Sequence, residues 1–242
     1  MNQQEIETIV RRVIDQLHNP SSAQGERGIF QSLDDAVAAA RTAQTQISSI
    51  KLRDRIIKEI RTTVRQCARE LAEMAVAETG FGRVEDKVCK HLLQANKTPG
   101  TEVVFPTAIS GDYGLALMEN APWGVIASVT PSTNPSATVI NNSISMIAGG
   151  NSVVFAPHPA AKAVSQRAVQ LVNEASVRAG GPDNIATTVA DPSLENANRL
   201  FVYPGINLLV VTGGDAVVEA ARAVTDKRLI AAGPGNPPVV VD

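Results

Sequence analysis

The feature that most constrains the fold of this chain is an alternation of strand and helix patterns that begins at Trp123. Short runs rich in apolar and β-branched residues are separated by segments with helical periodicity and by short loops. The predicted strands span residues 124–129, 152–155, 185–189, 207–211 and 238–241. The predicted helices between them span residues 136–148, 160–179, 193–201 and 214–224. Because such alternation is typical of right-handed crossovers, it predicts an α/β fold with a Rossmann-type parallel sheet flanked by helices.

A helical region precedes the predicted sheet. Ser32 is placed to cap a helix in the stretch LDDAVAAARTAQTQIS, which has acidic residues in its first turn. A long helix follows and is predicted to end at Gly80, and VEDKVCKHLLQANK is predicted to form a third helix. Cys67 and Cys89 fall within these helices, where ordinary helix packing is the expected role of each.

Residues 1–18 carry a separate amphipathic pattern. Six apolar residues recur at the spacing of one helical face: Ile6, Ile9, Val10, Val13, Ile14 and Leu17. Residues 19–29 are mostly polar and contain Pro and Gly, so they are interpreted as a flexible linker. A short amphipathic helix on such a linker is expected to bury its apolar face on a partner molecule. The alternative is that it packs on its own domain.

Composition and charge exclude several classes of protein. The 242 residues are 44% hydrophobic but only 3% aromatic, so the core must be built from Ala, Val, Ile and Leu. A net charge of -2 without a basic cluster argues against a nucleic-acid surface. No apolar run reaches the roughly 18 residues that span a bilayer, and residues 1–18 lack the apolar core of a secretory signal. Two cysteines without metal-site spacing indicate a reducing compartment, so we expect a cytoplasmic protein with no metal.

Polar or glycine-containing loops follow three of the predicted strands, and in a parallel sheet ligands bind at these carboxyl ends. The first loop runs from Thr130 through Pro131, Ser132, Thr133 and Asn134 to Pro135. The second is APHPAAK, which contains Pro157 and His158, and the third is Thr212-Gly213-Gly214-Asp215. Because Gly213 and Gly214 lack side chains, a phosphate can approach the backbone amides there. Neither GxGxxG nor GxxxxGK[ST] occurs, so the standard nucleotide-binding fingerprints are absent.

Taken together, these loops closely resemble the aldehyde dehydrogenase superfamily, through APWGVIASVTPSTNPSATVINNSISMIAGGNSVVFAPHPAAK, LLVVTGG and AAGPGNPPVVVD. Within it the chain resembles the CoA-acylating branch, nearest the acetaldehyde dehydrogenases of ethanolamine utilisation, with the propionaldehyde dehydrogenases of propanediol utilisation next. The resemblance covers essentially the whole chain. It implies that residues 30–242 are an NAD-binding domain and that the catalytic domain, with the nucleophilic Cys, lies beyond residue 242. Neither Cys67 nor Cys89 sits in a context that matches the family's nucleophile.

The resemblance implies NAD-dependent oxidation of a short-chain aldehyde, acetaldehyde first among them, with coenzyme A as co-substrate. The hydrolytic branch of the superfamily carries a Glu-Leu-Gly-Gly motif, whose Glu activates water. The matching stretch here is Ala231-Ala232-Gly233-Pro234, without a carboxylate, so CoA rather than water is expected to take the acyl group. Two alternatives are a hydrolysing aldehyde dehydrogenase and a non-catalytic fragment that binds a nucleotide or docks on a shell.

The resemblance also implies roles for the loop residues. The family's loop holds the amide that stabilises the oxyanion, and a gapless match places Thr133 there and Asn134 one residue later. Asn134 is favoured because an amide is the better donor, although both residues can also cap the following helix. His158 is either a ribose contact or a rigid loop residue. The residues implied to bind the cofactor are Thr130, Pro131, Ser132, Pro157, His158, Thr212, Gly213, Gly214 and Gly233.

Partners are implied in the same way. By resemblance to microcompartment enzymes, residues 1–18 are expected to bind a shell protein, which would locate the protein in a bacterial microcompartment within the cytoplasm. The family's oligomerising strands imply a homo-oligomer. Neither a nucleic acid nor a membrane is expected as a partner.

Overall fold

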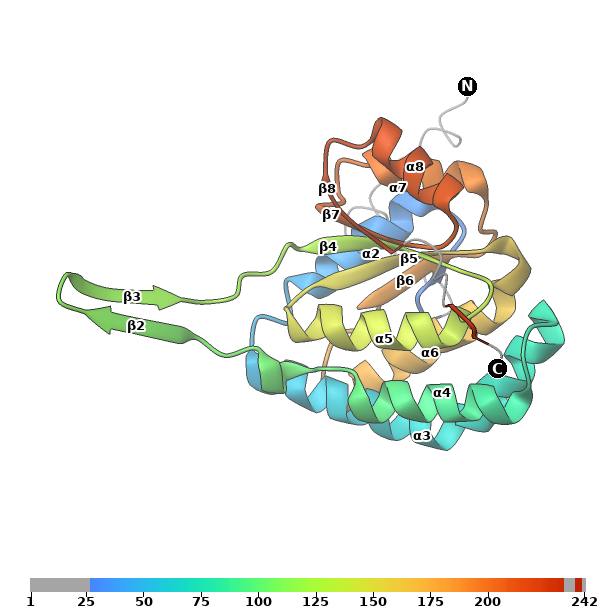
Figure 1. The fold of residues 1–242 in the computed structure, drawn as a ribbon, viewed down its shortest axis with the longest axis horizontal. Coiled ribbons are helices and arrows are strands. Elements are labelled where there is room, and N and C mark those ends of the chain that lie inside the picture. The colour runs from blue at the N-terminus through green and yellow to red at the C-terminus, as the bar shows by residue number, and fades with distance from the viewer. Residues whose placement is uncertain (1–26, 233–237, 241–242) are drawn as a thin grey trace, which may run out of the picture.

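The computed structural model describes residues 27–232 and 238–240 and contains a six-stranded parallel sheet (Figure 1). In spatial order its strands are β1 (Ile29–Phe30), β6 (Ala186–Val189), β5 (Ser152–Pro157), β4 (Val125–Thr130), β7 (Leu208–Thr212) and β8 (Arg228–Ala232). Helices flank the sheet on both faces. This confirms the predicted Rossmann-type α/β fold.

The two faces of the sheet are covered by different helices (Figure 1). On one face α5 (Pro135–Ala148) and α6 (Lys162–Arg178) pack against the strands, and α3 (Ile50–Thr79) and α4 (Val84–Lys97) pack outside them. On the other face lie α2 (Leu33–Gln44), α7 (Leu194–Val202) and α8 (Asp215–Val224). Successive residues of β4 alternate between the two cores, since Ile126 belongs to the first and Val125 and Ala127 to the second.

The helix ends follow their local sequence signals. The Ser32 hydroxyl accepts a hydrogen bond of 3.2 Å from the Asp35 amide, which confirms the predicted cap of α2. Helix α3 ends at Gly80, whose φ of 70° lies in the left-handed region that favours glycine. Helix α4 covers the whole of VEDKVCKHLLQANK, as predicted. The start of α2 and the end of α3 are therefore set by capping that is local in sequence, whereas the N-cap residue of α4 makes no side-chain capping bond.

Three expectations at the ends of the chain differ from the structure or lie outside it. Residues 238–240 belong to no strand, and the edge of the sheet is instead β8, which the sequence analysis missed. Most residues of β8 are exposed, although four of its five residues, Leu229 to Ala232, form an apolar run. Ile29 begins β1, although it was assigned to the linker 19–29. The predicted helix of residues 1–18 lies outside the described residues.

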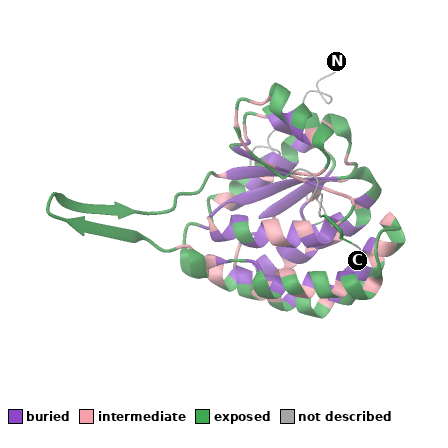
Figure 2. Cartoon of the chain, in the orientation of Figure 1, coloured by how far each residue is buried: buried purple, intermediate pink, exposed green. Residues whose placement is uncertain are grey.

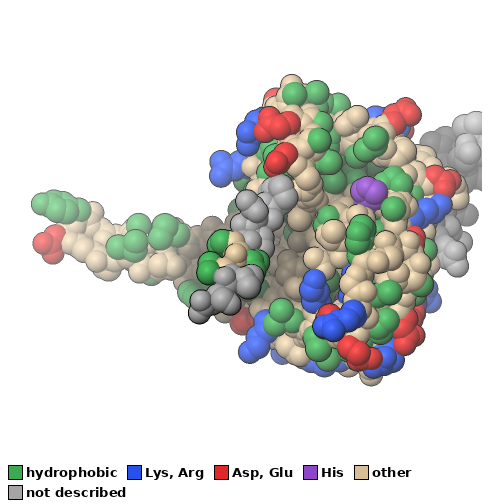
Figure 3. All heavy atoms as spheres, turned by 45° about the vertical axis from the view of Figure 1, so that its right-hand side comes forward, with side chains coloured by type: hydrophobic (Ala, Val, Ile, Leu, Met, Phe, Trp, Pro, Cys, Tyr) green, Lys and Arg blue, Asp and Glu red, His purple; other side chains and the backbone are tan. Residues whose placement is uncertain are grey.

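A hairpin projects from this α/β body (Figures 1 and 2). It consists of two antiparallel strands, β2 (Thr107–Gly111) and β3 (Gly114–Met118), and every residue in both strands is exposed. Green hydrophobic side chains lie along this arm in Figure 3. The apolar residues of the strands include Ile109, Leu115, Leu117 and Met118. The sequence analysis missed this hairpin, although two glycines, Gly111 and Gly114, bracket its two-residue turn.

Candidate functional site

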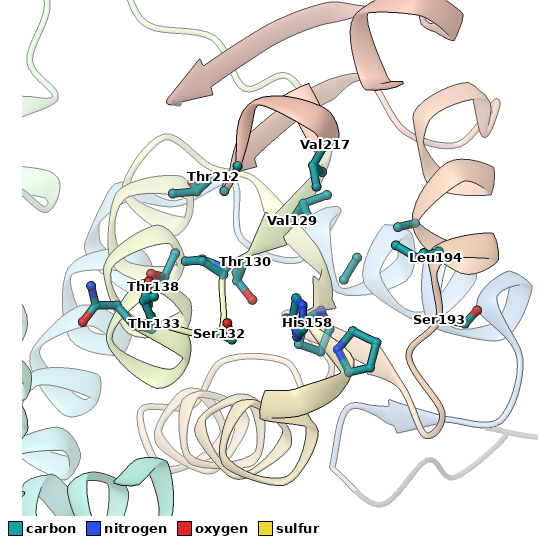
Figure 4. Close-up of a pocket in the computed structure, with 18 residues that line it drawn as sticks. Val129, Thr130, Ser132, Thr133, Thr138, His158, Ser193, Leu194, Thr212 and Val217 are labelled. Carbon is teal, nitrogen blue, oxygen red and sulfur yellow. Dashed lines mark hydrogen bonds between the residues drawn. The ribbon is translucent and has the colours of Figure 1, made fainter. Parts of the chain in front are cut away.

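A cleft of about 640 Å³ opens at the carboxyl ends of β4, β5 and β7 (Figure 4). Ten of the eleven residues that the sequence suggested as site residues line it: Thr130, Pro131, Ser132, Thr133, Asn134, Pro157, His158, Thr212, Gly213 and Gly214. The eleventh, Gly233, lies outside the described residues. The fold therefore brings three loops that are distant in sequence to one site.

The order of the strands explains why these loops meet. Strand β4 lies between β5 and β7 in the sheet, and the three strands end at nearly the same level. Thr130 at the end of β4 is in register with Pro157, and the neighbouring Val129 is in register with Val211. The His158 amide extends the ladder by donating to the Thr130 carbonyl over 3.2 Å. Ligands of open α/β sheets bind at this end of the strands.

The Thr130 side chain shows that this cleft has unused polar capacity. The residue is only 2% exposed, and its hydroxyl oxygen has no hydrogen-bond partner among the described residues. It lies within the ring of cleft-lining side chains in Figure 4. A buried hydroxyl without a partner costs about 1–3 kcal/mol, so a polar partner for this group would stabilise the site.

The helix N-termini near the sheet differ in what they can bind. At the start of α6, the amides of Ala163 and Val164 already donate to the Glu78 carboxylate, over 2.7 and 2.9 Å. At the start of α8, a Cβ added to Gly213 or Gly214 would meet no atom within 4 Å. The Gly213 amide donates to the Ala232 carbonyl over 3.4 Å, whereas no side-chain carboxylate among the described residues bonds the amides of this first turn. Because an anion needs room at a helix N-terminus, α8 rather than α6 is the end that suits a phosphate.

His158 presents a hydrogen-bond donor at the cleft. Its Nδ1 accepts from the Ala160 amide over 3.1 Å, so in the neutral ring the proton sits on Nε2. The residue is exposed and lines the cleft (Figure 4). The bond to Ala160 makes the loop rigid, and the position leaves Nε2 free to donate, so both interpretations of His158 remain compatible with its geometry.

Asn134 occupies the N-cap position of α5, but its side chain makes no capping hydrogen bond. The alternative that this side chain caps the helix is therefore wrong. Its backbone carbonyl instead accepts from Thr138, over 3.1 Å from the amide and 2.6 Å from the hydroxyl. The side-chain oxygen accepts from Lys90 Nζ over 3.0 Å. Thr133 and Asn134 both line the cleft, so the choice between them stays a prediction.

Comparison with known proteins decides the family. Residues 6–242 match the model of the aldehyde dehydrogenase family. The chain belongs to this family. It is 62% identical over 245 residues to the acetaldehyde dehydrogenase (acetylating) EutE of Escherichia coli K12, an alignment that covers 100% of this chain and 52% of the relative. The chain thus spans about half the length of the curated relatives it matches.

Two solved structures are similar in both sequence and fold. A propionaldehyde dehydrogenase from the fucose utilisation bacterial microcompartment of Clostridium phytofermentans is 50% identical, with a TM-score of 0.85. The match covers 87% of this chain and 49% of that one. The propionaldehyde dehydrogenase of Rhodopseudomonas palustris, solved with bound CoA and an acylated cysteine, is 45% identical, with a TM-score of 0.84. That match covers 88% of this chain and 49% of the other.

Helix α4 supplies functional candidates that the sequence analysis missed in this aldehyde dehydrogenase chain. Lys87 is only 5% exposed and donates from Nζ to the Thr133 carbonyl over 3.0 Å, and burial lowers its pKa. His91 is 1% exposed, and its Nε2 lies 2.8 Å from the Ser136 hydroxyl oxygen. Burial lowers the pKa of His91 to about 4, so it is neutral at pH 7. The signal was the i, i+3, i+4 spacing of Lys87, Lys90 and His91 on one helix face.

Neither cysteine of the chain has the features of a nucleophile. Cys67 is half-buried against the core, and burial, followed by the nearby Glu70, raises the pKa of its thiol. A raised pKa lowers the thiolate fraction that reacts. Cys89 is exposed on α4, which differs from the packing role expected for it. Neither residue lines the cleft.

The cleft of this aldehyde dehydrogenase chain has no acidic side chain among the described residues that line it. Ala231 and Ala232 end β8 in register with Val211 and Thr212 of β7. These two alanines begin the stretch that corresponds to the Glu-containing motif of the hydrolytic branch. The end of β8 therefore lies at the same edge of the sheet as the cleft. Elsewhere in residues 27–232 and 238–240, no group of three or more His, Cys, Asp or Glu side chains is arranged to hold a metal ion. No helix within these ranges has both the length and the apolarity to cross a bilayer.

Proposed function

We propose that this chain is the cofactor-binding part of an NAD-dependent, CoA-acylating aldehyde dehydrogenase. The reaction is aldehyde + CoA + NAD⁺ → acyl-CoA + NADH + H⁺, with acetaldehyde as the first candidate substrate and propionaldehyde as the second. The observation that carries the proposal is the cleft itself, whose lining residues include Thr130, with its buried and unpartnered hydroxyl, and the two glycines at the start of helix α8. In this proposal the nucleophile is neither Cys67 nor Cys89, since neither lines the cleft.

The residues of the cleft fit a dinucleotide. Gly213 and Gly214 leave room for a pyrophosphate at the start of α8, and His158 Nε2 can donate to a ribose hydroxyl. The polar residues Ser132 and Thr212 line the cleft beside the buried Thr130 and are available to hydrogen-bond the rest of the cofactor. When bound, NAD⁺ supplies the hydride acceptor of the reaction. The role of the chain is to bind and orient it next to the aldehyde.

Asn134 is proposed as the oxyanion donor. When a thiolate attacks an aldehyde, the carbonyl oxygen becomes negatively charged and is stabilised by a fixed N–H group. Two observations support Asn134 as this donor: the residue lines the cleft, and its side-chain oxygen accepts a hydrogen bond from Lys90. One such donor contributes roughly 3 kcal/mol to the transition state. Thr133 is the neighbouring alternative and has only a hydroxyl to offer.

Acyl transfer to CoA rather than water follows from the missing carboxylate. Without a general base, water attacks a thioester slowly, whereas the CoA thiol is a better nucleophile. The similar Rhodopseudomonas palustris enzyme, solved with bound CoA and an acylated cysteine, supports this order of events. The alternative, a hydrolysing aldehyde dehydrogenase, needs a base that the described cleft lacks.

The test uses an active enzyme that contains this chain together with a catalytic half. With acetaldehyde, NAD⁺ and CoA, acyl-CoA and NADH should form in equal amounts. Without CoA, at most one slow equivalent of NADH per site is expected, because the acyl-enzyme is not resolved. Sustained free-acid production without CoA would favour the hydrolysing alternative. Residues 1–242 alone should show no turnover, and turnover by this chain would place the nucleophile within it.

The remaining alternative is a non-catalytic fragment that binds a nucleotide or docks on a shell. We propose instead that residues 1–18 are a targeting segment of an enzyme and that a microcompartment shell protein binds them. Deleting them should leave turnover and melting temperature intact while abolishing co-purification with shells. Replacing Ile9 and Val13 together with Asp should do the same, because both changes remove the apolar stripe. Loss of folding in either variant would mean that the stripe packs on its own domain.

We also propose that the enzyme is a homo-oligomer and that the β2–β3 hairpin joins a second copy of the chain. The hairpin packs on nothing within the described body, and two exposed strands are marginal in water without a packing partner. Its exposed apolar side chains would be covered in the oligomer.

A further inference from the structure

We propose that Lys90 of helix α4 is a positioning residue that fixes the orientation of the Asn134 side-chain amide. The inference rests on the proposed function, because it assumes that Asn134 is the oxyanion donor. The contact that carries it is the hydrogen bond of 3.0 Å from Lys90 Nζ to Asn134 Oδ1. The two residues are 44 positions apart in the sequence and meet only because α4 packs against α5.

The chemistry of the lysine decides which way the amide faces. An ammonium group can only donate hydrogen bonds, so the amide atom beside it must be the oxygen. The Asn134 NH₂ group then faces away from Lys90, and no capping bond at the start of α5 competes for the side chain. Asn134 lies between two spaces, since it lines the main cleft and also a small crevice with Lys87, Lys90 and His91. With its oxygen held by Lys90, the NH₂ group makes no hydrogen bond within the described residues, so its donors are left for a ligand.

Lys90 also has no stronger partner among the described residues. Asp86, one helical turn earlier, is bonded to Arg83 over 2.7 and 3.2 Å. No carboxylate of the described part of the chain lies within 4.0 Å of Lys90 Nζ. A cation that bonds a neutral amide polarises it and strengthens its N–H groups as donors. Lys90 therefore both orients the amide and makes it a better donor.

Two neighbours on the same helix face hold the backbone around Asn134. Lys87 Nζ donates to the carbonyl of Thr133, the preceding residue. His91 Nε2 lies 2.8 Å from the hydroxyl oxygen of Ser136, two residues after Asn134. Both side chains are buried, so their role is to anchor the turn, whereas exposed Lys90 contacts the amide itself. Helix α4 thus holds residues 133–136 at three points.

The test is a double-mutant cycle in an active enzyme that contains this chain. Asn134→Ala should lower kcat roughly a hundredfold, and Lys90→Met should lower it roughly tenfold, with the Kd for NAD⁺ unchanged in both. In the Asn134→Ala background, Lys90→Met should change kcat less than about twofold, because the amide it positions is gone. Lys90→Arg, which keeps a cationic donor, should recover most of the activity. Lys97→Met, at an exposed lysine in the last turn of the same helix, is the matched control and should leave kcat unchanged.

The outcomes separate this inference from the proposed function. If Asn134→Ala lowers kcat but Lys90→Met does not, or if the two losses simply multiply, Lys90 does not act through Asn134 and the inference is overturned. If Asn134→Ala leaves kcat unchanged while Thr133→Ala lowers it, the oxyanion role moves to Thr133 and the role of Lys90 falls with it. A drop in melting temperature with Lys90→Met, accompanied by weaker NAD⁺ binding, would indicate a merely structural contact and would also overturn the inference.

Discussion

The α/β body and the β2–β3 hairpin of this chain use apolar residues in opposite ways. In the body, alternate residues of the central strands enter one of two cores, and large side chains such as Phe155 and Ile147 are almost fully buried. In the hairpin every residue of both strands is exposed, including leucines (Figure 2). Since burial of apolar area is the main stabilising force, the body can be stable from its own contacts and the hairpin cannot.

This difference teaches where each region's sequence constraints come from. Residues of the body are constrained by packing in its own cores and by the cleft. The hairpin's apolar residues have no such partner in the described chain, so their constraint comes from a surface outside it, which we propose to be a second copy. Matched substitutions in the two regions can therefore break or sharpen the comparison.

The largest effect is expected for a truncation in the core of the body. Leu71 in α3 is 0% exposed and belongs to the core on the α5–α6 face of the sheet. Leu71→Ala should lower the free energy of unfolding by roughly 2–5 kcal/mol, because it removes buried methyl groups and leaves a cavity. Urea denaturation measures this directly. A loss below about 1 kcal/mol would mean that the body is less tightly packed than its burial indicates.

A smaller effect concerns pH, which acts through a titratable group that only the body buries. The folded-state pKa of His91, about 4, lies below its ordinary value of 6.5. Between these values the unfolded chain binds more protons, so acidification favours unfolding. The contribution is fully present above about pH 6.5 and is lost as the pH falls toward 4. From pH 7 to pH 5 the free energy of unfolding should fall by roughly 2 kcal/mol more in the native protein than in His91→Asn. Equal pH slopes would refute the burial argument.

A third prediction compares a glycine of the cleft with a glycine of the hairpin. A Cβ at Gly213 or at Gly111 would meet no atom within 4 Å, so valine at either site should leave the fold intact. Gly213→Val should nevertheless raise the Kd for NAD⁺ roughly tenfold, about 1.4 kcal/mol, because the pyrophosphate must approach the backbone there. Gly111→Val should leave the Kd unchanged, and calorimetric titration distinguishes the two. Equal affinities would move the phosphate site away from α8.

The smallest effect on intrinsic stability is expected in the hairpin. Leu117 is 62% exposed, so Leu117→Ala should change the free energy of unfolding of the monomer by less than about 0.5 kcal/mol. The same change should weaken the oligomer, which sedimentation at several protein concentrations measures. Leu71→Ala and Leu117→Ala are the same substitution, so the difference between their effects on the free energy of unfolding reports the difference in burial. An unchanged oligomer would mean that Leu117 does not contact the second copy.

Much of the fold and of the cleft was predictable because the signals are local. Apolar runs predict the central strands. Ser32 predicts the start of one helix and Gly80 the end of another. The rule that ligands bind at carboxyl ends of parallel strands then selects the cleft loops. The failures fall where burial is missing: exposed β8 was overlooked, and the apolar run at residues 238–240 is in no strand.

By itself the sequence determined the parallel sheet, the helix boundaries and which loops line the cleft, because periodicity, capping and glycine content are properties of neighbouring residues. Only the tertiary structure decided what lies behind the cleft. Helix α4 reaches the turn of residues 133–136 across 44 to 46 positions of sequence, through Lys87, Lys90 and His91. Such contacts depend on how α4 packs against α5. The spacing of Lys87, Lys90 and His91 shows that they share one helix face, but it does not show which distant element that face contacts.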